Sequence, residues 1–311
     1  RDMAGRRELS KAAIEVVREA AVAQAPPMDA LRMGAAVLGL GRREDPLDQA
    51  LTAIAAFPAI VGAYWRFRNG EAPARVRADL SHAAHYLHQV SGVEPPPERA
   101  RALETYLNTV CDHGLNASTF AARVIVSTRS DLISAITGAV GALKGPLHGG
   151  APGPALDMVF EIGTPARAES VIREKLDRGE RLMGFGHRVY RVRDPRADVL
   201  AHAAERFYTS GGDRHLYDLA RSVEATALGL LRERKPDRRL DTNVEFYTAL
   251  LLHGIGLPKD LFTPTFAAGR VLGWAAHCLE QLREGRLIRP QSEYVGPMGL
   301  QYGVNGAAGY F

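Results

Sequence analysis

The chain has 311 residues, of which 46% are hydrophobic and 24% charged, and its formal net charge is +4. This composition is typical of a globular protein with one large domain or two ordinary ones, and the mild positive charge suits anionic small molecules without indicating nucleic acid as a partner. The two cysteines, Cys111 and Cys278, lie outside any metal-ligand spacing, and neither an apolar run of membrane-spanning length nor a signal peptide is recognised, so we expect a cytoplasmic protein without a membrane partner.

Helical periodicity dominates the first half of the chain. The chain opens at Arg1 rather than Met, which leaves the position of the natural N-terminus open. Ser10 is placed to cap the first helix, and Pro58 can kink the long apolar third one. The helices expected in this half cover residues 8–23, 28–40, 47–69, 75–90, 97–112, 120–128 and 131–143.

Three histidines, His82, His85 and His88, recur at a spacing of three in the helix expected over 75–90. Residues three apart are neighbours on a helix and could share a metal ion. No cysteine or carboxylate cluster accompanies them, so we interpret them as structural and expect no metal. The aromatic and basic residues at 64–68 are likewise interpreted as a helix end with snorkelling arginines rather than as a nucleic-acid surface.

Two glycine-rich breaks between helices each carry a histidine. His113 precedes Gly114 within the segment 112–119. His148 lies in the segment 144–154, where five Gly or Pro residues between 145 and 152 exclude both a helix and a central strand. We therefore expect His148 to be presented on a constrained loop.

The composition becomes more charged after residue 154, and no sustained alternation of β-branched residues predicts a strand. The fold is therefore expected to be all-α and large enough for two lobes with a ligand cleft between them. The tail, 289–311, is rich in Gly, Tyr and Pro and is expected to run extended over a surface. The helices expected in this half cover residues 155–162, 166–178, 198–208, 216–234, 244–253 and 265–282.

The segment 183–197 concentrates glycine, histidine and arginine. Gly184 and Gly186 allow a ligand to approach the backbone closely, and His187 follows directly. A hydrogen-bond donor among guanidinium groups suits an anionic substrate. The alternative is a basic surface loop with a structural histidine, because a lone G-x-G is a weak signal. The arginines of this segment are Arg188, Arg191, Arg193 and Arg196.

Histidines beside glycine and several isolated charged residues form a chemically coherent set. Glu245 supplies a carboxylate base within 243–247. The histidines supply hydrogen-bond donors and the arginines supply cations for substrate carboxylates. The other members of the set are His113, His148, His187, Arg196, Arg270 and Arg289.

The segments that carry this set resemble the citrate synthase family. They occur in the family's order and with similar spacing between about residues 75 and 295, whereas the N-terminal part is shorter and lacks the family's opening strand-rich segment. The resemblance implies a large helical domain (1–149 and 257–311) and a small one (150–256), with the active site between them. The matching segments are 112–119, 145–151, 184–190, 194–196, 243–247, 270–274 and 289–290.

The resemblance also implies a role for each matching residue. His148 corresponds to the histidine that hydrogen-bonds the acetyl-CoA thioester oxygen, His187 to the one that polarises the oxaloacetate carbonyl, and Glu245 to the base that removes the methyl proton. Arg289 corresponds to an arginine contributed across a homodimer interface. Those that match oxaloacetate-binding groups are His113, Arg196 and Arg270. Those assigned to coenzyme A are Leu182, Met183, Gly184, Phe185, Gly186 and Arg188.

The activity implied is the condensation of acetyl-CoA with oxaloacetate and water to citrate and CoA through an enol(ate), as in the tricarboxylic acid cycle. Acetyl-CoA is then a substrate, and no cofactor is expected. Two residues depart from the family pattern, because Glu245 stands where Asp is usual and Gln291 where a basic residue is frequent. Two alternatives stay open: 2-methylcitrate synthase, which uses propionyl-CoA, and a weakly active or non-catalytic sensor of CoA or a dicarboxylate.

Overall fold

The computed structural model describes residues 3–41, 45–148, 152–186, 194–237 and 240–299. Helices dominate these ranges, and their only strand-type pairing is the isolated bridge between Phe185 and Thr242. The all-α prediction is therefore confirmed. The α helices are α1 (Lys11–Val22), α2 (Pro27–Ala36), α3 (Pro46–Arg68), α4 (His82–Ser91), α5 (Pro97–Val110), α6 (Ala117–Ser127), α7 (Leu132–Leu143), α8 (Pro152–Ile162), α9 (Ala168–Asp177), α10 (Pro195–Thr209), α11 (Arg214–Arg234), α12 (Val244–Gly254) and α13 (Phe262–Glu284).

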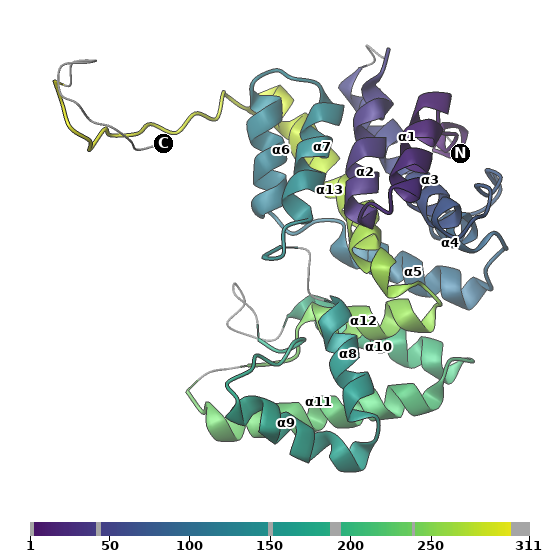
Figure 1. The fold of residues 1–311 in the computed structure, drawn as a ribbon, viewed down its shortest axis with the longest axis vertical. Coiled ribbons are helices and arrows are strands. Elements are labelled where there is room, and N and C mark those ends of the chain that lie inside the picture. Colours follow the sequence, from purple (N-terminus) through teal and green to yellow (C-terminus); the bar gives the residue numbers. More distant parts are fainter. Residues whose placement is uncertain (1–2, 42–44, 149–151, 187–193, 238–239, 300–311) are drawn as a thin grey trace.

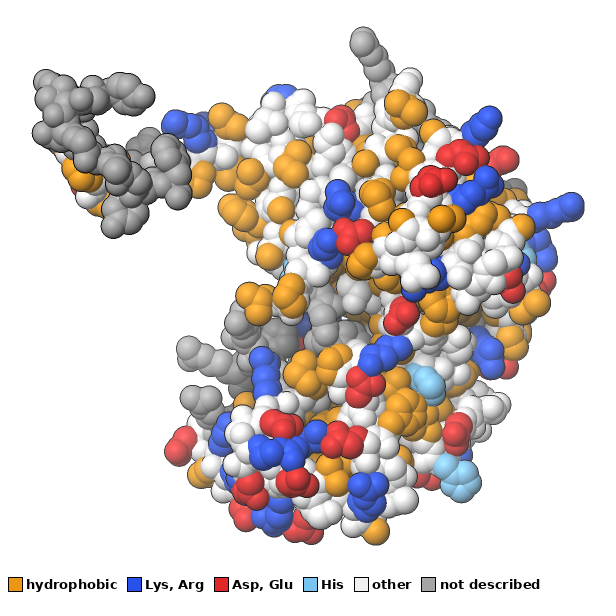
Figure 2. Space-filling view, viewed as in Figure 1, with side chains coloured by type: hydrophobic (Ala, Val, Ile, Leu, Met, Phe, Trp, Pro, Cys, Tyr) orange, Lys and Arg blue, Asp and Glu red, His pale blue; other side chains and the backbone are white. Residues whose placement is uncertain are grey.

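The helices gather into two groups (Figure 1). Helices α1 to α7 and α13 form the upper group, and α8 to α12 form the lower one. The two groups meet where α5 packs against α10 and α12, and where α13 packs against α8. Figure 2 shows a hollow between the groups, and acidic and basic side chains intermixed over the lower one. The predicted domain limits at 149/150 and 256/257 remain predictions, because residues 149–151 lie outside the described ranges.

Helix α3 is the central helix of the upper group. Asp45 caps its first turn, and the helix continues through Pro58 to Arg68 without interruption. It is long and apolar enough to cross a membrane by length and composition, contrary to the expectation that no apolar run in the chain reaches that length. However, 72% of its apolar window is buried inside the protein. Burial against the surrounding helices therefore accounts for its apolar composition.

The predicted start of one helix was wrong. The helix expected over 75–90 begins only at His82, because Ser81 caps it and the segment before it has other partners. Arg7 donates hydrogen bonds to the carbonyls of Arg77 and Leu80, at 2.6 and 3.0 Å. The described part of the tail, residues 289–299, leaves the upper group beyond α13 (Figure 1), and Val295 in it is 92% exposed.

The crossing of α3 and α4 offers a test of this packing. A Cβ atom added at Gly62 would lie 2.5 Å from the Cβ of Gln89 and 2.6 Å from its carbonyl carbon. We predict that Gly62→Ala lowers the free energy of unfolding by about 1–3 kcal/mol, because the backbone of α4 must shift. The control is Gly229→Ala in α11, where the added atom meets nothing within 4 Å and should stabilise by about 0.5–1 kcal/mol. Denaturant unfolding of both variants measures this, and equal effects would contradict the packing described.

Candidate active site

The start of α12 is tied to the glycine segment that precedes His187. Asn243 caps α12 by accepting from the Glu245 N–H, at 3.0 Å. The Asn243 backbone N–H donates to the Gly184 carbonyl, and its side-chain amide donates to the Gly186 carbonyl, at 2.9 and 2.8 Å. Gly184 has a φ of +90°, and a Cβ there would lie 3.0 Å from the Cβ of Phe246. Only glycine fits this approach without strain, so the segment 184–186 and Glu245 share one rigid frame.

Glu245 lies in the first turn of α12 and is half-buried. Burial raises the pKa of its carboxyl to about 7, with a further raising effect from Asp194, while the positive charge of Arg196 opposes the shift. A carboxyl group that titrates near neutral pH can both take and return a proton under physiological conditions. This is the property required of a general base.

Arg196 is fixed at the start of α10 by a buried carboxylate. Asp194, 1% exposed, caps the helix by accepting from the Arg196 N–H. The same carboxylate accepts from Nε and Nη2 of Arg196, at 3.1 and 2.8 Å. Such a two-point pair fixes the plane of the guanidinium group. Arg196 is therefore a preorganised cation beside Glu245.

Arg270 is a buried cation in the middle of α13. It is 1% exposed, its Nε donates to the Val110 carbonyl at 2.8 Å, and its guanidinium carbon lies 4.7 Å from the ring centre of Phe266. Within the described part of the chain its Nη2 has no hydrogen-bond partner. Burial lowers the pKa of Arg270 to about 10, and the nearby charge of Arg196 adds to this effect. A buried, incompletely bonded cation of this kind is stabilised by an anionic ligand.

His148 is held in one tautomer by α6. The backbone N–H of Ser118 lies 3.3 Å from His148 Nε2, and Ser118 Oγ lies 2.8 Å from the same nitrogen. Ser118 is itself buried and accepts from Trp274 Nε1 at 3.0 Å. Because a backbone N–H can only donate, Nε2 is the acceptor and Nδ1 carries the proton of the neutral ring. Burial, followed by the charge of Arg270, lowers the pKa of His148, which keeps the imidazole neutral and able to donate from Nδ1.

The charged members of the site act on one another across the junction of the two helix groups. Tyr106 of α5 is 1% exposed, and burial raises the pKa of its hydroxyl well above its usual value. The charge of Glu245 adds to that shift, while Arg270 and Arg196 oppose it. Residues of α5 and α13 therefore lie close to residues of α10 and α12. The site is built from both groups.

The structure brings together four of the predicted site residues. His148, Arg196, Arg270 and Glu245 are coupled electrostatically, as described above. His113 is half-buried in the turn before α6. His187 and Arg188 lie outside the described residues. Arg289 is exposed in the segment that follows α13, and that segment projects away from the upper group (Figure 1).

The segment predicted to contact coenzyme A can offer mainly its backbone. The side chains of Leu182 and Phe185 are each 4% exposed and belong to the core. The sequence did not indicate two residues of the site, Asp194, which holds Arg196, and Tyr106, which is within electrostatic reach of Glu245, Arg196 and Arg270. Asp194 had a signal, because Asp before Pro at a helix start is a frequent cap. Tyr106 had none, since an aromatic residue at helical spacing looks like any core residue.

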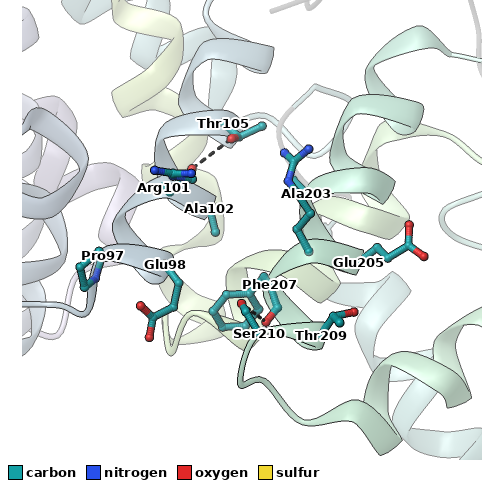
Figure 3. A pocket seen from close by; sticks show the side chains of 11 residues that line it. Pro97, Glu98, Arg101, Ala102, Thr105, Ala203, Glu205, Phe207, Thr209 and Ser210 are labelled. Carbon is teal, nitrogen blue, oxygen red and sulfur yellow. Dashed lines mark hydrogen bonds between the residues drawn. The ribbon is translucent and has the colours of Figure 1, made fainter.

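A separate cleft of 790 Å³ opens between α5 and α10 (Figure 3). Glu98 and Arg101 of α5 line one side, and Glu205 of α10 and Ser210, which caps the end of α10, line the other. The hydrogen bonds drawn in Figure 3 each stay within one helix, so they do not bridge the cleft. Its α10 wall lies toward the C-terminal end of the helix, whereas Arg196 lies in the first turn, roughly 10 Å or more along the axis. The cleft is therefore distinct from the candidate active site.

Comparison with known proteins identifies the same family over most of the chain. The sequence profile described as "Citrate synthase, C-terminal domain" matches residues 1–291. "Citrate synthase 2" of Bacillus subtilis is 40% identical over 94% of this chain and 82% of its own length. "Putative citrate synthase 2" of Mycobacterium tuberculosis is 52% identical over 66% of this chain, and the match spans 53% of that relative. "2-methylcitrate synthase" of Shewanella oneidensis is 38% identical over 94% of this chain and 77% of its own length.

Solved structures of citrate synthases have the same fold. Citrate synthase from Pyrobaculum aerophilum superposes with a TM-score of 0.84 at 38% identity, over 96% of this chain and 78% of that one. Citrate synthase from Thermoplasma acidophilum, solved as a ternary complex with carboxymethyl coenzyme A and oxaloacetate, gives 0.82 at 31% identity over 96% and 80%.

The raised pKa of Glu245 makes a prediction about stability. Between pH 4.5, the ordinary pKa of a Glu, and about pH 7, the Glu245 carboxyl stays protonated in the folded protein but loses its proton in the unfolded chain. The free energy of unfolding should therefore fall over that pH interval through this group. Glu245→Gln cannot titrate, so its stability relative to the wild type should be greater at about pH 8 than at about pH 4. Denaturant unfolding at both pH values measures this difference, and a value independent of pH would show that Glu245 titrates normally.

Proposed function

The chain belongs to the citrate synthase family, and on that premise we propose that this enzyme condenses acetyl-CoA with oxaloacetate and water to give citrate and CoA. The observation that carries the proposal is the presence, at one junction of the two helix groups, of a carboxyl group that titrates near neutral pH and of a buried, incompletely bonded cation. The pKa of Glu245 is raised to about 7. The buried Nη2 of Arg270 has no hydrogen-bond partner within the described residues. Removal of a proton from carbon requires the base, and binding of an anionic acceptor requires the cation, so the condensation needs both features.

The proposed reaction begins at the acetyl methyl group. Glu245 removes a methyl proton while His148 donates from Nδ1 to the thioester oxygen, so that the enol(ate) forms without a full isolated charge. The nucleophilic carbon then attacks the oxaloacetate carbonyl, which His187 polarises. Water finally cleaves the thioester and releases citrate and CoA.

In this proposal the substrates are positioned by the cations and by the glycine-containing segment 182–186. We assign the oxaloacetate carboxylates to Arg196, Arg270 and His113, and coenzyme A to residues 182–186 and Arg188. Closure of the two proposed domains, 1–149 with 257–311 against 150–256, would exclude water from the enol(ate). Acetyl-CoA enters as a substrate, and the reaction assigned to these residues uses no cofactor or metal.

The acyl donor is the open part of the proposal. Propionyl-CoA would give 2-methylcitrate, and one relative carries that name. The two donors differ by one methyl group, which a pocket discriminates by only about 1–3 kcal/mol. Glu245 is one methylene longer than the usual Asp, and a shift of about 1 Å can cost about 100-fold in rate. A weakly active sensor is therefore the alternative that the same residue motivates.

A homodimer would complete the site. Arg289 is exposed and is followed in the sequence by apolar residues, in the segment after α13 that projects from the upper group (Figure 1). Val295 and Met298 are 92% and 82% exposed. Exposed apolar residues on a projecting segment favour contact with another protein surface. We propose that this surface belongs to a second copy of the chain, with Arg289 entering the neighbouring site.

The activity can be tested by thiol release from acetyl-CoA and from propionyl-CoA, each with and without oxaloacetate. We predict release that requires oxaloacetate, and a loss of at least about 100-fold in Glu245→Gln, which keeps the side-chain shape and removes its basicity. Glu245→Asp separates enzyme from sensor. If the site is built around Glu, the shorter side chain should slow the reaction by about 10-fold or more. Faster turnover in Glu245→Asp would favour the sensor, and full activity in Glu245→Gln would falsify the base assignment.

The shared site can be tested by subunit mixing. His187→Ala and Arg289→Ala should each be inactive as homodimers. Heterodimers of the two chains contain one intact site, so activity should return toward about a quarter of the wild-type value if exchange is random. Native mass spectrometry confirms the exchange. Mixed dimers without recovered activity would count against Arg289 acting in trans.

A further inference from the structure

Glu224 is a buried carboxylate that the proposed reaction does not use. It lies on α11, is 4% exposed, and accepts three hydrogen bonds. Its Oε1 accepts from the Thr242 hydroxyl at 2.6 Å. Its Oε2 accepts from the Tyr247 hydroxyl at 2.5 Å and from Arg221 Nη1 at 2.7 Å. Arg221 Nη1 also donates to the Tyr247 hydroxyl at 2.6 Å, so the four side chains form one connected network.

The partners of Glu224 lie on both sides of the catalytic carboxylate. Thr242 directly precedes Asn243, the cap of α12, and Tyr247 follows Glu245 by two residues on the same helix. Tyr247 is fully buried. A displacement of α12 or of its cap relative to α11 would therefore break at least one of these bonds. The first turn of α12, which carries Glu245, is held from both ends.

The same network reaches the glycine segment. Thr242 forms the antiparallel bridge with Phe185. The carbonyl of Asp241, the residue before it, accepts from the Gly186 N–H at 2.8 Å. Asn243, the residue after it, bonds both Gly184 and Gly186. Through Thr242, Glu224 thus holds the stretch 241–243, which supports both the 184–186 segment and the start of α12.

Burial of a carboxylate is costly, and three donors offset that cost only when all are in place. Apolar residues of similar volume often stabilise a core equally well, so a buried charge fixed from both oxygens is better suited to setting position than to adding stability. Positioning matters here because a shift of about 1 Å in a catalytic group can cost about 100-fold in rate.

We propose that Glu224 is a positioning residue, which with Thr242, Tyr247 and Arg221 sets the place of the Glu245 carboxylate and of the 184–186 segment. This inference rests on the proposed function for its effect on rate. Its effect on backbone protection is independent of that function. Arg196 donates to Asp194 and Arg270 donates to the Val110 carbonyl, and neither acceptor belongs to this network, so we expect oxaloacetate binding not to depend on it.

The test compares variants that remove one hydroxyl each. Thr242→Val removes the donor to Oε1 and nearly preserves volume, and Thr242→Ser restores that donor. Tyr247→Phe removes the donor to Oε2. The control is Tyr217→Phe, also on the buried side of α11, since the Tyr217 hydroxyl makes no hydrogen bond within the described residues and its ring stacks on Tyr208.

Two readouts are measured on each full-length variant. The first is kcat and KM for oxaloacetate by thiol release. The second is hydrogen exchange of the Gly186 and Asn243 amides, which are bonded to Asp241 and Gly184. We expect Thr242→Val and Tyr247→Phe to lower kcat by about 10-fold or more with KM for oxaloacetate nearly unchanged, and to speed exchange at both amides. Thr242→Ser and Tyr217→Phe should resemble the wild type in both readouts.

Each other outcome identifies what is wrong. Unchanged amide exchange in both Thr242→Val and Tyr247→Phe would show that the Glu224 network does not hold the 184–186 segment and the start of α12. Faster exchange with unchanged kcat, or a loss of rate that Thr242→Ser shares, would overturn its role in positioning the base. If the wild type releases no thiol, the proposed function fails, and the exchange measurement alone still decides whether Glu224 holds the two segments.

Discussion

The buried guanidinium of Arg270 is the constraint on which the site depends. It lies within α13, the helix by which the chain returns to the upper group, and it satisfies the last carbonyl of α5. One of its nitrogens lacks a partner among the described residues, and a second cation, Arg196, approaches from the lower group and adds to the lowering of its pKa. Two cations at one junction repel each other, so an anion between the helix groups would stabilise their closer approach. Binding of an anionic ligand would therefore favour the domain closure proposed above.

The same cation sets the state of the groups around it. Its charge adds to burial in keeping His148 neutral, and Ser118 fixes which ring nitrogen can donate. For Glu245 the two effects oppose each other, because burial favours the neutral carboxyl while the charge of Arg196 favours the ionised one. The outcome is a neutral imidazole that can donate a hydrogen bond, together with a carboxyl group that titrates near neutral pH, and the two come from different helix groups. The Glu224 network extends this arrangement behind α12, where it fixes position rather than charge.

Much of the fold could be predicted from the sequence, because helical periodicity and Gly- or Pro-rich breaks are local signals. The capping of the first helix by Ser10 and the loop that carries His148 were predicted on that basis. The segment 75–81 was not, because its carbonyls are held by Arg7, some seventy residues away in the chain. The Glu224 network was invisible for a related reason. A Glu on a charged helix and a Tyr at core spacing carry no sign of each other until the helices pack.

The central claim is that Arg270 binds a substrate carboxylate, and calorimetric titration of oxaloacetate tests it most directly. Wild-type protein should bind one molecule per site. Arg270→Leu should bind at least about 10-fold more weakly, because a charged hydrogen-bond donor is lost. Arg101→Leu is the matched control, since Arg101 is exposed in the cleft between α5 and α10 and should not affect binding. Undiminished binding of oxaloacetate by a folded Arg270→Leu protein would contradict the account.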